Sequence, residues 1–120
     1  MADRLMLVGF EGEEAQEMLD TYASRGWEAY AASPTDEAAH ERLVAVQPLA
    51  VVFCLSGGCS DATRDLAQRL VEDPGPAQPL IVFAGGDPDG VALARTAAPH
   101  AVFVNPDEVG WVLKHLTVKM

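Results

Sequence analysis

Basic residues are scarce in this sequence of 120 residues. It contains 8 lysines and arginines against 18 aspartates and glutamates, which gives a formal net charge of −10. Binding to nucleic acid or to an anionic membrane needs a basic surface that displaces counterions or meets the lipid charge. The composition therefore argues against both nucleic acid and an anionic membrane as partners. The net charge by itself favours a basic protein as the binding partner.

Cysteines and long apolar runs are scarce as well. Two cysteines, Cys54 and Cys59, are too few for the disulfide framework of a secreted scaffold. The N-terminus lacks the basic-then-apolar pattern of a signal peptide, and no apolar run approaches the length needed to cross a membrane. We therefore expect a cytoplasmic protein with no membrane partner.

One unbroken apolar run dominates the sequence that is present. Residues 48–58 read PLAVVFCLSGG, so the apolar segment is closed by small, turn-forming residues. An apolar run without alternation is typical of a strand buried on both faces, which requires a parallel sheet covered by helices on each side. Cys54 then lies at the carboxyl end of a central strand, where such sheets place their binding sites.

The rest of the chain alternates between strand and helix patterns. Strands are predicted at 4–10, 27–31, 48–54, 79–84 and 101–104, and helices at 13–22, 38–46, 61–71, 91–97 and 107–116, with a loop at 85–90. With 49% hydrophobic residues, the chain has enough apolar surface for one compact core. We predict a single α/β domain over residues 1–120, with a five-stranded, doubly wound parallel sheet between two helical layers.

The layout resembles the flavodoxin-like fold of the response-regulator receiver domain, the phosphoacceptor module of two-component signalling. The resemblance covers nearly the whole chain and rests on the order and spacing of the elements. Pro48 and Pro79 open the third and fourth strands, and Asn105-Pro106 follows the fifth strand, where the family has Lys-Pro. The resemblance also implies a cis peptide bond before Pro106.

The residues that perform phosphoryl transfer in that family are replaced in this sequence. The family's acceptor aspartate corresponds to Cys54, and its two metal-binding acids correspond to Phe10 and Glu11, or to Gly9 and Phe10. Its hydroxyl residue corresponds to Ala84, its lysine to Asn105 and its switch aromatic to Val102. Phosphoryl transfer depends on positioned charge and Mg²⁺. The chain therefore resembles a pseudo-receiver, which implies no catalytic residue, no metal and no cofactor.

Other chemistry is weaker in the sequence. Cys54 and Cys59 do not have the Cys-x-x-Cys spacing of a redox pair, and Cys54 is predicted to be a small core residue that reacts slowly, with Cys59 on a loop. His40, His100 and His115 fall on different elements, which favours surface positions over a metal site. The acidic residues around Glu13 are predicted to form a solvated face.

Three hypotheses on function follow. The first is a protein-interaction module that regulates or localises a partner without phosphorylation; the second is a small-ligand or redox sensor at the pocket around Cys54; the third is a residual enzyme, for which no nucleophile and base converge. The first is favoured. Since receivers generally meet partners or self-associate through helix four, strand five and helix five, the resemblance implies an interaction face there, with Trp111, Val91, Val102 and Lys114.

Overall fold

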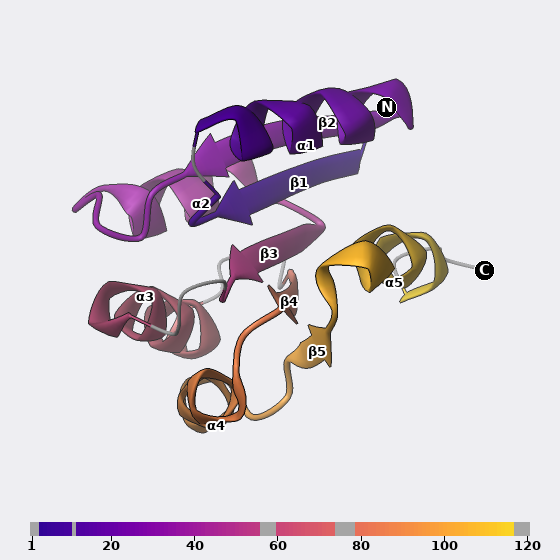
Figure 1. Cartoon of the computed structure of the whole chain (residues 1–120). Helices are drawn as coiled ribbons and strands as arrows, with labels where there is room; N and C mark the ends of the chain where they lie inside the picture. Colours follow the sequence, from indigo (N-terminus) through magenta and orange to yellow (C-terminus); the bar gives the residue numbers. More distant parts are fainter. Residues whose placement is uncertain (1–2, 11, 56–59, 74–78, 117–120) are drawn as a thin grey trace.

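The computed structural model of the chain describes residues 3–10, 12–55, 60–73 and 79–116 (Figure 1). Its five strands are β1 (Asp3–Val8), β2 (Trp27–Ala32), β3 (Ala50–Cys54), β4 (Leu80–Ala84) and β5 (Val102–Val104). The helices are α1 (Gly12–Ser24), α2 (Ala39–Val46), α3 (Asp61–Glu72), α4 (Pro88–Ala97) and α5 (Val109–Leu116), and a short 3₁₀ turn, η1 (Pro106–Glu108), precedes α5. The predicted alternation of strands and helices is confirmed.

The strands form one parallel sheet in the order β2-β1-β3-β4-β5. Two apolar clusters cover its two faces. One cluster joins the sheet to α2, α3 and α4, and the other joins it to α1 and α5. The structure therefore has the predicted three layers. None of the helices among the described residues is long and apolar enough to span a bilayer.

The central strand β3 explains the unbroken apolar run. Side chains of adjacent strand residues point to opposite faces of a sheet. Val51 and Phe53 accordingly pack into the cluster under α2, α3 and α4, while Ala50 and Val52 pack into the cluster under α1 and α5. All four are fully buried, so every position of the strand needs an apolar side chain.

Three phenylalanines form a stacked row across the sheet. Phe53 lies opposite Phe83, and Phe83 lies opposite Phe103, in the register of the parallel strands. The ring centroids are 5.0 Å apart in the first pair and 5.2 Å apart in the second. The Arg95 guanidinium covers the outer ring, 5.0 Å from the centroid of Phe103. The row ties the three strands on this side of the sheet to α4.

Helix α4 begins inside the segment predicted to be a loop. Its first residue is Pro88, and the Asp87 side chain accepts a hydrogen bond of 2.7 Å from the Gly90 backbone N–H. An aspartate cap followed by proline at the first helical position is a favourable helix start, because proline has no N–H to leave unpaired there. The predicted loop at 85–90 is therefore too long by three residues.

The expected cis peptide bond before Pro106 is also wrong. No peptide bond among the described residues is cis. Pro106 instead opens the turn η1, in which the Glu108 N–H donates to the Asn105 carbonyl at 2.9 Å. The Asn105 N–H donates to Glu108 Oε1 at 3.1 Å. These two bonds fix a helix-like start, for which trans proline has a suitable φ angle.

Candidate functional site

A small cavity lies at the carboxyl edge of the sheet, where receiver domains have their phosphorylation site. Its volume is about 260 Å³. Phe10 follows β1, Cys54 ends β3 and Ala84 ends β4, and all three line it. The other lining residues come from α1 and α5: Glu14, Glu17, Met18, Thr21, Tyr22 and Val109. The structure thus brings three of the predicted pocket residues together.

The strand ends supply an apolar floor to this cavity. Cys54 lies opposite Ala84 in the register of β3 and β4, and Ala84 is almost fully buried. Phe10 is buried in the cluster under α1 and α5, and an added Cβ on Gly9 would lie 3.6 Å from Cys54 Cβ. Cys54 packs against this cluster, as predicted for a small core residue, but it is half-buried, because its side chain also lies at the cavity surface.

The remaining pocket predictions have different outcomes. Asn105 is exposed and is not among the lining residues, and its backbone is held in the turn η1. Glu11 lies outside the described residues, as does Cys59. The sequence patterns did not indicate that α1 lines this pocket, although Met18 and Tyr22 lie at helical spacing on the inward face of that helix.

The residues at this site do not fit the Mg²⁺ that receiver domains use. Mg²⁺ requires near-octahedral coordination by oxygen, including carboxylates. Phe10, Cys54 and Ala84 offer no side-chain oxygen, and the two lining carboxylates, Glu14 and Glu17, are exposed on α1. Within the described parts of the chain, no group of three or more His, Cys, Asp or Glu side chains is placed to hold a metal ion.

Tyr22 separates this cavity from a larger groove on the same side of the sheet. It lines both. Burial raises the pKa of the Tyr22 phenol above its ordinary value of 10.0, and the Arg25 guanidinium opposes this shift. That guanidinium lies over the tyrosine ring, 5.7 Å from its centroid. Tyr22 is therefore neutral near pH 7 and serves as an apolar wall with a polar tip.

The residues of the predicted interaction face come from both sides of the edge strand β5. Val91 is half-buried against the cluster under α2, α3 and α4, whereas Val102 is half-buried against the cluster on the other face of the sheet. Trp111 is 61% exposed, as predicted, and Lys114 is exposed one turn further along α5. Trp111 and Lys114 line the larger groove beside α1 and β2, away from α4.

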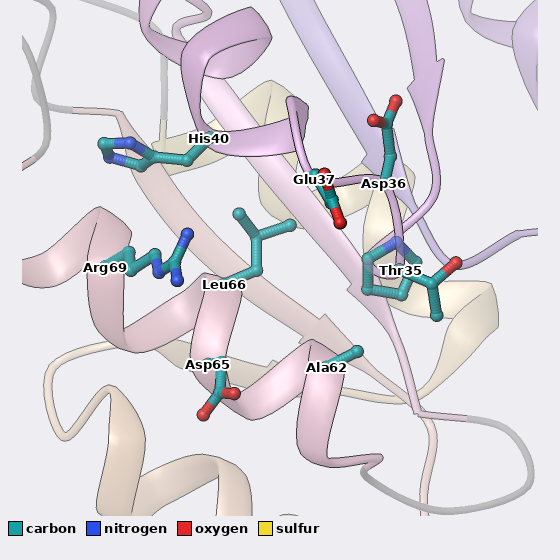
Figure 2. A pocket seen from close by; sticks show the side chains of 9 residues that line it. Thr35, Asp36, Glu37, His40, Ala62, Asp65, Leu66 and Arg69 are labelled. Carbon is teal, nitrogen blue, oxygen red and sulfur yellow. The ribbon is translucent and has the colours of Figure 1, made fainter.

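A second pocket with charged walls lies between the β2–α2 connection and α3, and its volume is about 530 Å³ (Figure 2). Figure 2 shows His40 and Arg69 at one end, with Asp36, Glu37 and Thr35 toward the other. His40 Nε2 makes a hydrogen bond of 2.9 Å with the Asp73 carbonyl, and Asp36 pairs with Arg42. His40 thus has a structural bond, and His100 and His115 lie exposed on other elements, as predicted.

The cavity predicts how Cys54 reacts with thiol reagents. The test uses a Cys59→Ser background, in which each rate of modification is divided by the rate for the same reagent on the urea-unfolded chain. We expect the small neutral reagent methyl methanethiosulfonate to modify Cys54 several times faster than the bulky dianion of Ellman's reagent. The reason is that the cavity is small and Glu14 and Glu17 line it with negative charge. Mass spectrometry over time measures both rates. Equal normalised rates would mean that Cys54 is not reached through this cavity.

The fold is shared with a solved structure. The structure is similar to the NMR structure of the pseudo-receiver domain of the CikA protein, with a TM-score of 0.69 and 21% sequence identity. The match covers 99% of this chain and 100% of that domain. No protein-family model matches the sequence, and neither does any curated protein. At this identity the likeness establishes the fold, so the expected receiver-like architecture is confirmed.

Proposed function

We propose that this chain, a degenerate receiver-like domain, is a signalling module of the cytoplasm that regulates a protein partner without being phosphorylated and without catalysing a reaction. The observation on which this rests is the composition of the strand-end cavity. Three positions that correspond to reactive residues of receiver domains line this cavity. They are occupied by an aromatic ring (Phe10), a thiol (Cys54) and a methyl group (Ala84). These three side chains supply neither a cation nor an oxygen ligand for Mg²⁺, so they cannot stabilise the charge that develops during phosphoryl transfer.

Partner binding is the function that remains for such a fold. The full match in length to a pseudo-receiver domain supports this assignment, because the whole architecture is present while the reactive groups are replaced. Exposed Trp111 on α5 supports a contact surface, since tryptophan is favoured as an anchor of protein interfaces. The proposal therefore assigns binding to the outer side of α5 and not to the cavity.

Incubation with acetyl phosphate and Mg²⁺ tests the absence of phosphorylation. We expect the intact mass to remain unchanged, because no carboxylate stands at the end of β3 and the lining residues do not fit the metal. The Cys54→Asp variant is also expected to stay unmodified, since Ala84 and Phe10 remain. A conventional receiver treated in parallel verifies the phosphodonor. A stable phosphoryl adduct on the unaltered chain would contradict the proposed function.

A further inference from the structure

A broad groove lies between the end of α1, the start of β2 and α5. Its volume is about 710 Å³. The residues that shape it include Arg25, Trp27, Gly110, Trp111, Lys114 and His115. Trp27 and Trp111 are the two tryptophans of the chain, so all of its indole rings line this one groove. The groove lies at the amino-terminal ends of the strands, because Asp3 and Trp27 are the first residues of β1 and β2. The Cys54 cavity lies at the opposite, carboxyl-terminal ends.

The charge of the groove is opposite to that of the chain. Two permanent cations, Arg25 and Lys114, line it together with His115, and Asp3 is the single acid among the lining residues. The chain as a whole has a net charge of −10. In the described part of the chain, the ion pairs use Arg4, Arg42 and Arg64, and neither groove cation belongs to one. Both cations are therefore available to an incoming carboxylate.

A stacking contact orients the exposed indole of Trp111 in the groove. The His115 ring stacks on Trp111 with 4.4 Å between ring centroids, and His115 Nδ1 donates to the Trp111 carbonyl at 2.8 Å. This contact orients the indole while leaving 61% of Trp111 exposed. Arg25 lies against Gly110, where an added Cβ would be 2.6 Å from Arg25 Nη1. The absence of a side chain at Gly110 thus gives the guanidinium its position in the groove.

From this arrangement we propose that the groove binds an acidic segment of a protein partner, with an apolar side chain against Trp111 and carboxylates at Arg25 and Lys114. The inference rests on the proposed function and names the chemistry of its partner. The net charge alone favours a basic partner, but at physiological salt the Debye length is about 8 Å, so the remote acids are screened and the nearby cations dominate. Guanidinium and carboxylate pair well, and aromatic and arginine side chains are the usual anchors of protein interfaces.

A short tryptophan-free peptide of alternating glutamate and leucine tests the proposal. Addition of this peptide is expected to change the tryptophan emission, because both fluorophores line the groove. Titration calorimetry should show at least about tenfold weaker binding for Trp111→Ala, since anchor residues contribute most to affinity. The double variant Arg25→Gln, Lys114→Gln should bind about fivefold more weakly at low salt and lose most of its salt dependence.

Matched variants separate this groove from a general charge effect. Arg69→Gln removes the charge of one exposed arginine of α3 outside the groove, which is half the charge change of the double variant, and should leave the affinity unchanged within twofold. Gly110→Ala should weaken binding several-fold without removing a charge, because its methyl group displaces Arg25. Circular dichroism of each variant verifies that it is folded.

Several results would overturn the inference. The first is that a lysine–leucine peptide binds as well as the glutamate–leucine peptide, or that a single-stranded oligonucleotide binds more tightly. The second is that Trp111→Ala and the double charge variant leave the affinity for the glutamate–leucine peptide unchanged. The third is that this peptide does not bind at all. Sedimentation that shows self-association sensitive to Trp111→Ala would also overturn it, because a second copy would then occupy the groove. None of these results requires phosphorylation, so this inference and the proposed function fail separately.

Discussion

Replacement of Phe83 with alanine is expected to lower the free energy of unfolding by about 3–5 kcal/mol, the range for a buried phenylalanine. Phe83 is the middle ring of the row Phe53, Phe83 and Phe103, and it is fully buried. The alanine variant loses the burial of one ring and both stacking contacts, and leaves a void between two strands. Because domains of this size are stable by about 5–15 kcal/mol, much of the total would be lost.

Urea unfolding followed by circular dichroism measures this loss, and two variants calibrate it. Phe103→Ala should cost clearly less, because Phe103 is only half-buried and stacks on one neighbour. Phe83→Leu keeps most of the volume and should cost less than half as much. If Phe83→Ala and Phe103→Ala were equally destabilising, the ring row would not be centred on Phe83 as the structure has it.

Substitution of Gly86 by alanine is expected to cost about 2–5 kcal/mol, although it adds one methyl group. Gly86 has φ +92°, and an added Cβ would lie 2.8 Å from Leu55 Cβ, which cannot move without the backbone after β3. A non-glycine residue at such a φ costs about 1–2 kcal/mol, and overpacking adds about 1–3 kcal/mol.

Gly26 provides the matched control. It has nearly the same φ, +95°, but nothing within 4 Å of an added Cβ. Gly26→Ala should therefore show the conformational cost alone, about 1–2 kcal/mol. The difference between the two variants in urea unfolding isolates the contact with Leu55. Equal losses would mean that the loops after β3 and β4 are not packed against each other at the carboxyl edge.

The likeness to receiver domains was visible in the sequence because it depends on local patterns. The first part of the run 48–58 could be assigned to a strand buried on both faces, since no polar residue precedes Ser56, and β3 confirms this. The replaced reactive positions could be located because they follow strand ends at fixed spacing, and Phe10, Cys54 and Ala84 do meet at one cavity. Short-range patterns of this kind survive a change of function.

Two local details were missed for a shared reason. The start of α4 at Pro88 and the trans bond before Pro106 both depend on side chains that cap the backbone, Asp87 in one case and Glu108 in the other. A capping aspartate or glutamate and a loop aspartate or glutamate have the same appearance in a sequence. The expectation of a cis bond came from the family resemblance, and the bonds around Asn105 decide against it.

By itself the sequence determined the class of fold, the order of its elements and the loss of phosphoryl-transfer residues, because hydrophobic periodicity and strand-end identities are properties of neighbouring residues. Only the tertiary structure decided which side chains share a surface. It packed Val91 and the inward side of α5 against opposite faces of the sheet, and it placed Trp111 beside Arg25 and Trp27, more than 80 residues earlier in the chain. The pairing of α1 with α5 on one face arises from the strand order of the whole sheet, which no local pattern specifies.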